Sequence, residues 1–190
     1  MTIIGSQTEK NLLSAFANES VSRNTYLFFA DKAKKEKLIT IANIFNDTAD
    51  HELSHAKTFF KFLEGTNVSI QSKFSIKPIA STLENLKLAA ADEHTEWTNT
   101  YLHFAEVAKE EGFSAVAAKF KLIASVEEQH ERRFLQFISR LETKTLYKRE
   151  VEIQWKCLKC GFVHTGTFAP EVCAACNHPQ GYFSPIEPAY

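Results

Sequence analysis

The chain has 190 residues, of which 44% are hydrophobic and 24% charged, and its formal net charge at pH 7 is -1. These values predict a globular protein with a full core and exclude a chain that is disordered over its whole length. The balanced charge provides no basic surface for nucleic acid or anionic lipid. No segment reaches the roughly 20 apolar residues of a membrane-spanning helix, and the start lacks a signal peptide, so we expect a cytoplasmic protein without membrane or nucleic-acid partners.

Helical periodicity dominates the first 140 residues. The first expected helix opens with a Ser-x-x-Glu capping box at Ser6 and places Glu19 on its apolar face. A second helix, over about 38–64, places Glu52 and His55 on its apolar face. Each of these two helices therefore carries ionisable groups where the core should be.

Residues 66–79 have no helical period and contain Pro78, which predicts an extended crossover between two helical hairpins. A third helix opens with another capping box at Ser81 and extends to about residue 112. It places Glu93 and Glu96 one turn apart on the core side. The crossover and the third helix thus begin a second hairpin of the same design.

A fourth helix, over about 114–141, places Glu127 and His130 on its buried face. The chain also contains a faint internal repeat, in which the second hairpin follows the first by 74 or 75 residues. The related pairs are Glu19 and Glu93, Glu52 and Glu127, and His55 and His130. We therefore expect four antiparallel helices built from two related hairpins.

Five carboxylates fall on the expected core faces: Glu19, Glu52, Glu93, Glu96 and Glu127. An ionised carboxylate in a core costs several kcal/mol unless it is paired or bound to a metal. A Glu-x-x-His pair projects an oxygen and a nitrogen from one helical turn toward a common point. One glutamate from each of two helices and one Glu-x-x-His pair from each of the other two is the ligand pattern of ferritin-like di-iron bundles. One isolated Glu-x-x-His pair is usually solvated, but two in register favour two divalent iron or manganese ions.

Tyr26 and Tyr101 follow Glu19 and Glu93 by about two turns. This spacing makes both tyrosines candidate hydrogen-bond donors to the ligands, although ordinary core aromatics have the same pattern. His51 and His94 neighbour expected ligands but point elsewhere on their helices, so we interpret them as surface residues or supports of the ligands.

All four cysteines lie in the last 40 residues, as two Cys-x-x-Cys pairs: Cys157, Cys160, Cys173 and Cys176. A charged linker over 142–150 and a short expected strand over 151–155 separate them from the helices. The spacing suits one tetrahedral ion held by four thiolates. From the spacing alone, structural zinc and redox-active iron are equally compatible.

The segments "AFANESVSRNTY", "ADEHTEWT", "EEQHERRF" and "CLKCGFVHTGTFAPEVCAACNHPQGYF" resemble those of the rubrerythrin family, and the resemblance covers essentially the whole chain. It implies a mainly α fold, with a ferritin-like four-helix bundle at 1–145 and a rubredoxin-like domain at 151–190. It also implies three iron ions per chain, without haem or flavin. The implied di-iron ligands are Glu19, Glu52, His55, Glu93, Glu96, Glu127 and His130, and the implied ligands of the third iron are Cys157, Cys160, Cys173 and Cys176.

The same resemblance implies a peroxidase that reduces hydrogen peroxide to water. Electrons would come through the cysteine site from rubredoxin or an NAD(P)H-dependent reductase, in a homodimer or larger homo-oligomer. In the family, the glutamate at the position of Glu96 alternates with the histidine at the position of His55 as iron changes oxidation state. Asn177 stands where free rubredoxins have glycine, and asparagine tolerates the left-handed backbone of that turn. A ferroxidase or iron-handling protein, and a di-iron sensor with a zinc-ribbon tail, remain the alternatives.

Overall fold

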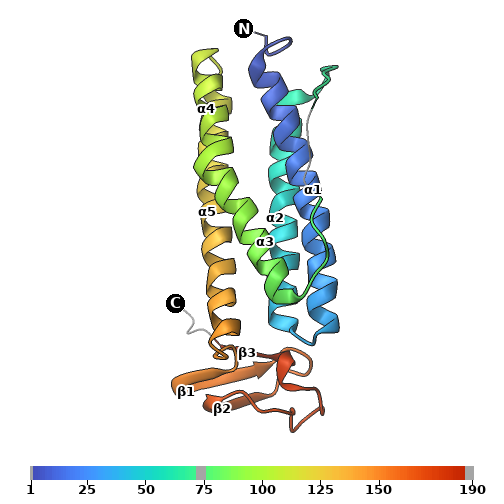
Figure 1. Ribbon diagram of the computed structural model, residues 1–190, viewed down its shortest axis with the longest axis vertical. Helices are drawn as coiled ribbons and strands as arrows, with labels where there is room; N and C mark the ends of the chain where they lie inside the picture. Colours follow the sequence, from blue (N-terminus) through green and yellow to red (C-terminus); the bar gives the residue numbers. More distant parts are fainter. Residues whose placement is uncertain (1, 72–75, 187–190) are drawn as a thin grey trace.

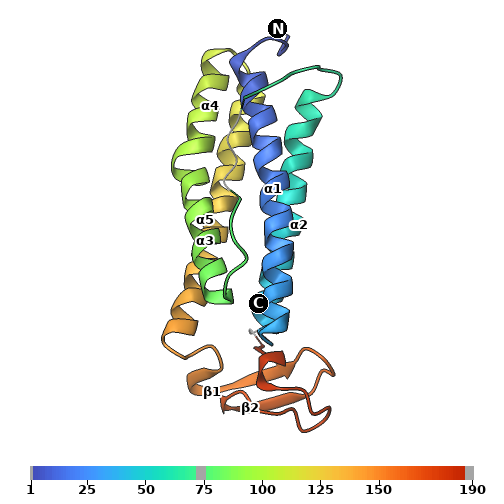
Figure 2. The same cartoon turned by 45° about the vertical axis from the view of Figure 1, so that its right-hand side comes forward.

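The computed structural model describes residues 2–71 and 76–186, and its main body is a four-helix bundle (Figure 1). The first hairpin consists of α1 (Gln7–Lys35) and α2 (Ile39–Leu63). The second consists of α3 (Thr82–Thr95), a π-helical turn η1 (Glu96–Thr100) and α4 (Tyr101–Glu110), which form one rod beside α5 (Ser114–Glu142). The crossover between the hairpins runs along the bundle (Figure 2), and residues 72–75 of the predicted extended segment lie outside the described residues.

Both predicted capping boxes begin helices in the structure. Ser6 Oγ accepts a hydrogen bond from the backbone N–H of Glu9 at 3.0 Å, and Ser81 Oγ accepts one from Glu84 at 3.3 Å. These bonds satisfy amide groups that have no partner within the first helical turn. Of the helices in residues 2–71 and 76–186, none is both long and apolar enough to span a membrane.

Two apolar clusters divide the interior of the bundle. On each long helix the apolar residues separate into two sets, and the buried carboxylates lie between them. The first cluster is built around Tyr26, Phe29, Phe45, Leu86 and Phe134. The second is built around Leu12, Phe59, Tyr101, Phe120 and Ile123. The middle of the bundle is therefore a charged layer between two buried apolar layers that are rich in aromatic residues.

The small domain has a three-stranded antiparallel sheet in the order β2-β1-β3, at one end of the bundle (Figure 2). Its strands are β1 (Lys148–Cys157), β2 (Val163–Phe168) and β3 (Phe183–Pro185). The strand predicted at 151–155 begins earlier, because Lys148 already pairs with Phe168 across the ladder. The side chain of Trp155 is fully buried, and its indole N–H donates to the carbonyl of Gly166 at 3.0 Å.

The small domain packs against the turn between α1 and α2. The hydroxyl of Thr40 donates to the carbonyl of Phe183 at 3.2 Å, and Gly181 lies against the backbone of Lys37. A Cβ atom on Gly181 would overlap the carbonyl oxygen of Lys37, so this backbone approach requires glycine.

We expect Gly181→Ala to separate the small domain from the bundle, because backbone atoms of the turn cannot yield to the added methyl group. Overpacking of this kind costs about 1–3 kcal/mol. Limited proteolysis of residues 142–150, together with thermal unfolding, measures the effect. The matched control is Gly166→Ala, whose added Cβ is crowded by the ring of His164, which can rotate away, and makes only an ordinary contact with the carbonyl oxygen of Phe168. Equal cleavage rates in the two variants would show that the packing at Lys37 is not needed.

Candidate metal centres

Four helices bring carboxylate and imidazole groups together in the charged layer. Two groups of four residues have ligand atoms that all lie within 4.8 Å of one another. The groups are Glu19, Glu52, His55 and Glu127, and Glu52, Glu93, Glu127 and His130. Both groups contain Glu52 and Glu127, so the arrangement consists of two adjacent sites with two shared carboxylates.

The shared carboxylates each face both imidazoles. Oε1 of Glu127 lies 2.9 Å from Nδ1 of His55, and Oε2 of Glu127 lies 2.7 Å from Nδ1 of His130. The two oxygens of Glu52 lie 3.6 Å and 3.2 Å from the same nitrogens. Each of these glutamates can therefore place one oxygen on each of two ions, while Glu19 and Glu93 each serve one site.

Several ligand atoms of this cluster are buried and make no hydrogen bond, although the carboxylate oxygens and imidazole nitrogens lie close to one another. Among the described residues, such atoms include Oε2 of Glu19, Oε2 of Glu93, both carboxylate oxygens of Glu52 and Glu127, and Nδ1 of His55 and His130. Buried polar groups without partners are costly, and they concentrate here on one point. Two divalent ions would supply the missing partners and four positive charges, so the residues fit a two-metal site.

Without metal, the ionisable groups of the cluster have strongly shifted pKa values. Burial raises the pKa values of Glu19 and Glu93 well above the usual range, and the charge of Glu52 adds to both shifts. Burial opposes the charging of His130, but the facing carboxylates of Glu127 and Glu52 raise its pKa to about 11. The metal-free cluster therefore holds extra protons, and metal uptake must release them.

The two tyrosines connect the hairpins crosswise. The hydroxyl of Tyr26 on α1 donates to Oε1 of Glu93 on α3 at 2.6 Å. The hydroxyl of Tyr101 on α4 donates to Oε1 of Glu19 on α1. The sequence predicted tyrosine donors near the ligands, but it did not show that each tyrosine supports the glutamate of the other hairpin.

The π turn η1 brings Tyr101 into a position equivalent to that of Tyr26. Tyr26 follows Glu19 by seven residues, whereas Tyr101 follows Glu93 by eight. In a regular α-helix one extra residue would turn Tyr101 by about 100° relative to its counterpart. The wider π turn absorbs that residue, so the predicted uniform helix over 81–112 is wrong at 96–100. The change in repeat spacing from 74 to 75 residues was the sequence signal for this turn.

Glu96 opens the π turn and differs from the other six predicted ligands. It lies outside both four-residue groups and is only half-buried. Burial raises its pKa well above the usual range, and the charges of Glu19 and Glu93 add to the shift. It is therefore close enough to the cluster to sense its charge, without belonging to either group.

His51 contacts the cluster from outside. Its Nδ1 lies 3.0 Å from Nε2 of His130, and the two rings stack with centroids 5.2 Å apart. Because Nδ1 of His130 faces the carboxylates, His51 occupies the other ring nitrogen and fixes the orientation of the imidazole. From its position on the helix, His51 was expected to be either a surface residue or a residue that supports a ligand, and its contact with His130 makes it the latter. His94 instead lies 3.1 Å from Glu131, away from the ligands.

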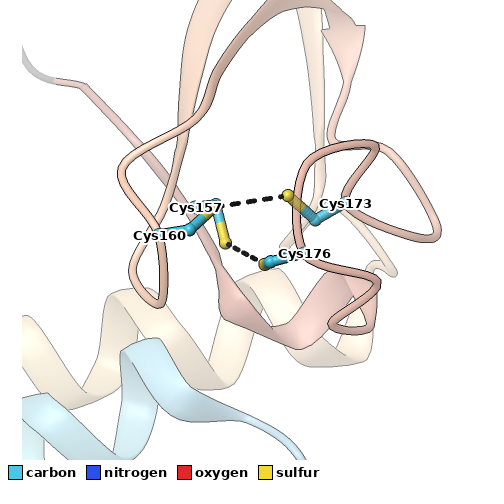
Figure 3. A group of neighbouring side chains, drawn as sticks. All are labelled: Cys157, Cys160, Cys173 and Cys176. Atoms are coloured by element: carbon cyan, nitrogen blue, oxygen red, sulfur yellow. Dashed lines mark hydrogen bonds between the residues drawn. The ribbon is translucent and has the colours of Figure 1, made fainter.

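The four cysteines converge from the end of β1 with the turn that follows it, and from the loop that carries Cys173 and Cys176 (Figure 3). The sulfur atoms of Cys157 and Cys176 are 3.8 Å apart, and those of Cys160 and Cys173 are 3.7 Å apart. All four are free thiols. Metal–sulfur bonds of about 2.3 Å in a tetrahedron give sulfur–sulfur edges of about 3.8 Å, so the sulfurs fit one metal ion.

The two cysteine loops share one backbone design. The residue after each second cysteine is left-handed, with φ of 82° at Gly161 and 58° at Asn177. Their N–H groups donate to the carbonyls of Cys157 at 2.8 Å and Cys173 at 2.9 Å. The expectation that asparagine would tolerate this turn is confirmed. Burial alone would raise the pKa of Cys173. Hydrogen bonds to its sulfur, chiefly from the backbone N–H of Ala175, instead lower this pKa to about 7, which favours the thiolate.

Comparison with protein families gives matches over both parts of the chain. A model described as Rubrerythrin matches residues 10–138 and 84–154, and a model described as Rubrerythrin, rubredoxin-like domain matches residues 155–184. Rubrerythrin of Porphyromonas gingivalis is 50% identical over 189 residues, covering 100% of this chain and 94% of that protein. Rubrerythrin of Nitratidesulfovibrio vulgaris is 48% identical over 179 residues, covering 94% of each.

Solved structures show the same architecture. The structure titled fully reduced state of nigerythrin, all ferrous, superposes with a TM-score of 0.65 at 25% sequence identity. The match covers 97% of this chain and 92% of that one. The fold class inferred from the sequence, a ferritin-like bundle followed by a small cysteine domain, is thereby confirmed.

We expect Tyr101→Phe to lower the free energy of unfolding by about 1–3 kcal/mol, because it leaves a buried carboxylate without its donor. Urea unfolding at matched metal content measures the change, and Tyr26→Phe should behave alike. Tyr147→Phe is the control, because the buried Tyr147 hydroxyl has no described hydrogen-bond partner. The crosswise bonds would be unimportant if all three variants unfolded at the same urea concentration.

Proposed function

Because this chain belongs to the rubrerythrin family, an iron oxidoreductase family, we propose that it is a peroxidase that reduces hydrogen peroxide to water. Its two clusters suit three iron ions per chain, a di-iron pair in the bundle and one iron in the four-cysteine site. The sharing of Glu52 and Glu127 between two adjacent sites is the observation on which the proposal depends.

The residues that would hold the iron pair are Glu19, Glu52, His55, Glu93, Glu127 and His130, with Glu96 beside them. When bound, the pair supplies the two electrons that convert one peroxide and two protons into two water molecules. Tyr26 and Tyr101 hold in place the carboxylates of Glu93 and Glu19, each of which serves one site only. Glu96, which neither group includes, is free to exchange with His55 as a ligand, and we propose that it does so when the oxidation state changes.

Electrons must return to the cluster after each peroxide. Thr40, which contacts the small domain, and His55 are 15 residues apart on α2, or roughly 22 Å along the helix. Electron transfer slows steeply with distance, so a four-cysteine site of a second copy that lay closer to the cluster would be a better donor than that of the same chain. We therefore propose a homodimer or larger homo-oligomer. The sequence has no G-x-G-x-x-G loop for a dinucleotide, so a separate protein must deliver the electrons. We propose that rubredoxin or an NAD(P)H-dependent reductase reduces the cysteine site, and that it does so in the cytoplasm.

The decisive experiment is stopped-flow absorbance of the anaerobically reduced protein mixed with a slight excess of hydrogen peroxide. A peroxidase should rapidly regain the visible band of the ferric four-thiolate site, as electrons pass from the tail to the oxidised pair. The isolated tail fragment, if it folds and binds iron, measures the direct reaction with peroxide. A slow return at the rate of that direct reaction would favour an iron-handling ferroxidase. A colourless tail with two irons and one zinc per chain would favour the sensor.

We expect Glu96→Ala to fold normally and to reduce peroxide at least about tenfold more slowly, a modest loss for a group positioned at a reacting centre. Steady-state peroxide consumption at equal iron content measures the loss. Glu106→Ala on α4 is the control, because Glu106 is exposed on the same rod. Unchanged turnover in Glu96→Ala would remove Glu96 from the mechanism.

A further inference from the structure

A polar cavity of about 280 Å³ lies between α1 and the start of the π turn. Its polar lining includes Asn18, Ser22, Thr25, Thr95, Glu96 and Thr100. Side-chain hydroxyl, amide and carboxyl groups thus surround a space at the level of the charged layer. A space of this volume and polarity suits small, neutral, hydrogen-bonding molecules.

The cavity is lined by two residues that adjoin the cluster, Glu96 and Tyr26. Of the seven predicted iron ligands, only Glu96 lines the cavity. Tyr26 also lines it, and the hydroxyl of Tyr26 donates to Glu93. A molecule inside the cavity therefore meets Glu96 and Tyr26 before it meets the two four-residue groups.

An ion pair stands at the outer side of the cavity. Nζ of Lys77, from the crossover, lies 2.9 Å from Oδ1 of Asp92 on α3, and both residues line the cavity. Their side chains are 23% and 36% exposed, so this side faces solvent. The two charges offset each other, so the entrance has no net charge with which to select ions over neutral molecules.

Ser22 makes the space possible. It stands 74 residues before Glu96, the same step that relates Glu19 to Glu93, so it is the counterpart of Glu96 in the first hairpin. Ser22 and Glu96 line one cavity. The small serine side chain at this position leaves volume that a second glutamate would reduce.

We propose that this cavity is the route by which hydrogen peroxide reaches the carboxylate–histidine cluster, with Ser22 setting its width and the Lys77–Asp92 pair its entrance. The inference rests on the proposed peroxidase function. A water molecule occupies about 30 Å³ in the liquid, so the cavity has room for a peroxide molecule with several waters. Its hydroxyl groups can replace part of the peroxide's hydration on the way to the cluster.

The test uses the full-length, iron-loaded protein and the variant Ser22→Leu. We expect this variant to lower the second-order rate constant for oxidation of the reduced protein by peroxide by about tenfold, or roughly 1.4 kcal/mol in activation free energy. The association rate of azide with the oxidised protein, followed by visible absorbance, should fall by a similar factor. Asn24→Leu is the control, because Asn24 is exposed on the same helix and does not line this cavity.

Azide equilibrium separates a route from a binding site. A residue that only narrows a route slows azide association and dissociation equally, so the dissociation constant should stay unchanged in Ser22→Leu. Equal azide association rates in Ser22→Leu and the unmodified protein would overturn the proposal. A changed dissociation constant at an unchanged association rate would also overturn it, by placing Ser22 in the binding site. If azide behaves as expected while peroxide does not oxidise the unmodified protein, the route stands and the peroxidase function fails.

The entrance is tested with Lys77→Ala, which removes the ion pair with Asp92. We expect the rate at which tert-butyl hydroperoxide, a bulky hydroperoxide, oxidises the reduced variant to rise several-fold relative to the rate with hydrogen peroxide. Lys87→Ala is the control, because Lys87 makes a comparable surface ion pair with Glu142 at 2.6 Å outside the cavity. The same preference between hydroperoxides in both variants would remove Lys77 from the entrance.

Discussion

The burial of carboxylates in the middle of the bundle is the constraint on which the rest of the structure depends. Glu19, Glu52, Glu93 and Glu127 are at most 1% exposed, although an ionised carboxylate in such surroundings is strongly disfavoured. Only dense compensation makes this layer tolerable, and the imidazoles and tyrosine hydroxyls provide a part of it. The imidazoles and tyrosines leave several buried oxygen and nitrogen atoms without hydrogen bonds, and divalent ions would bind these atoms and offset the remaining negative charge. Metal binding and folding of the bundle are therefore linked.

The aromatic clusters on either side make the charged layer effective. They exclude water above and below the cluster, so charges inside interact through a medium of low polarity. Each aromatic cluster also contributes one tyrosine hydroxyl to the layer, from Tyr26 on one side and Tyr101 on the other. The same residues thus complete the apolar core and orient the acidic groups. A change in core packing at either tyrosine would consequently displace a carboxylate as well.

Much of this arrangement could be predicted from the sequence, because helical period and ligand spacing are local properties. Two Glu-x-x-His pairs in register fixed which helix faces meet, and two Cys-x-x-Cys pairs fixed the second cluster. The change in repeat spacing from 74 to 75 residues marks one extra residue between Glu93 and Tyr101, but helical periodicity does not show that a π turn accommodates it. The contact of His51 with His130 depends on how two helices from different hairpins pack, and no local pattern contains that information. The early start of β1 likewise depends on pairing with β2.

The crosswise tyrosine bonds have a consequence for the origin of such a chain. Neither hairpin supplies the hydrogen-bond donor for its own unshared glutamate. Glu19 requires the tyrosine of the second hairpin, and Glu93 requires the tyrosine of the first. Two identical hairpins related by a two-fold axis would form the same pair of bonds, so a symmetric assembly of half-length chains could already enclose this layer. What such an assembly could not do is place serine at one of two equivalent positions and glutamate at the other, as this chain does at 22 and 96. Only when the two halves are joined in one chain can the two sides of the centre carry different residues.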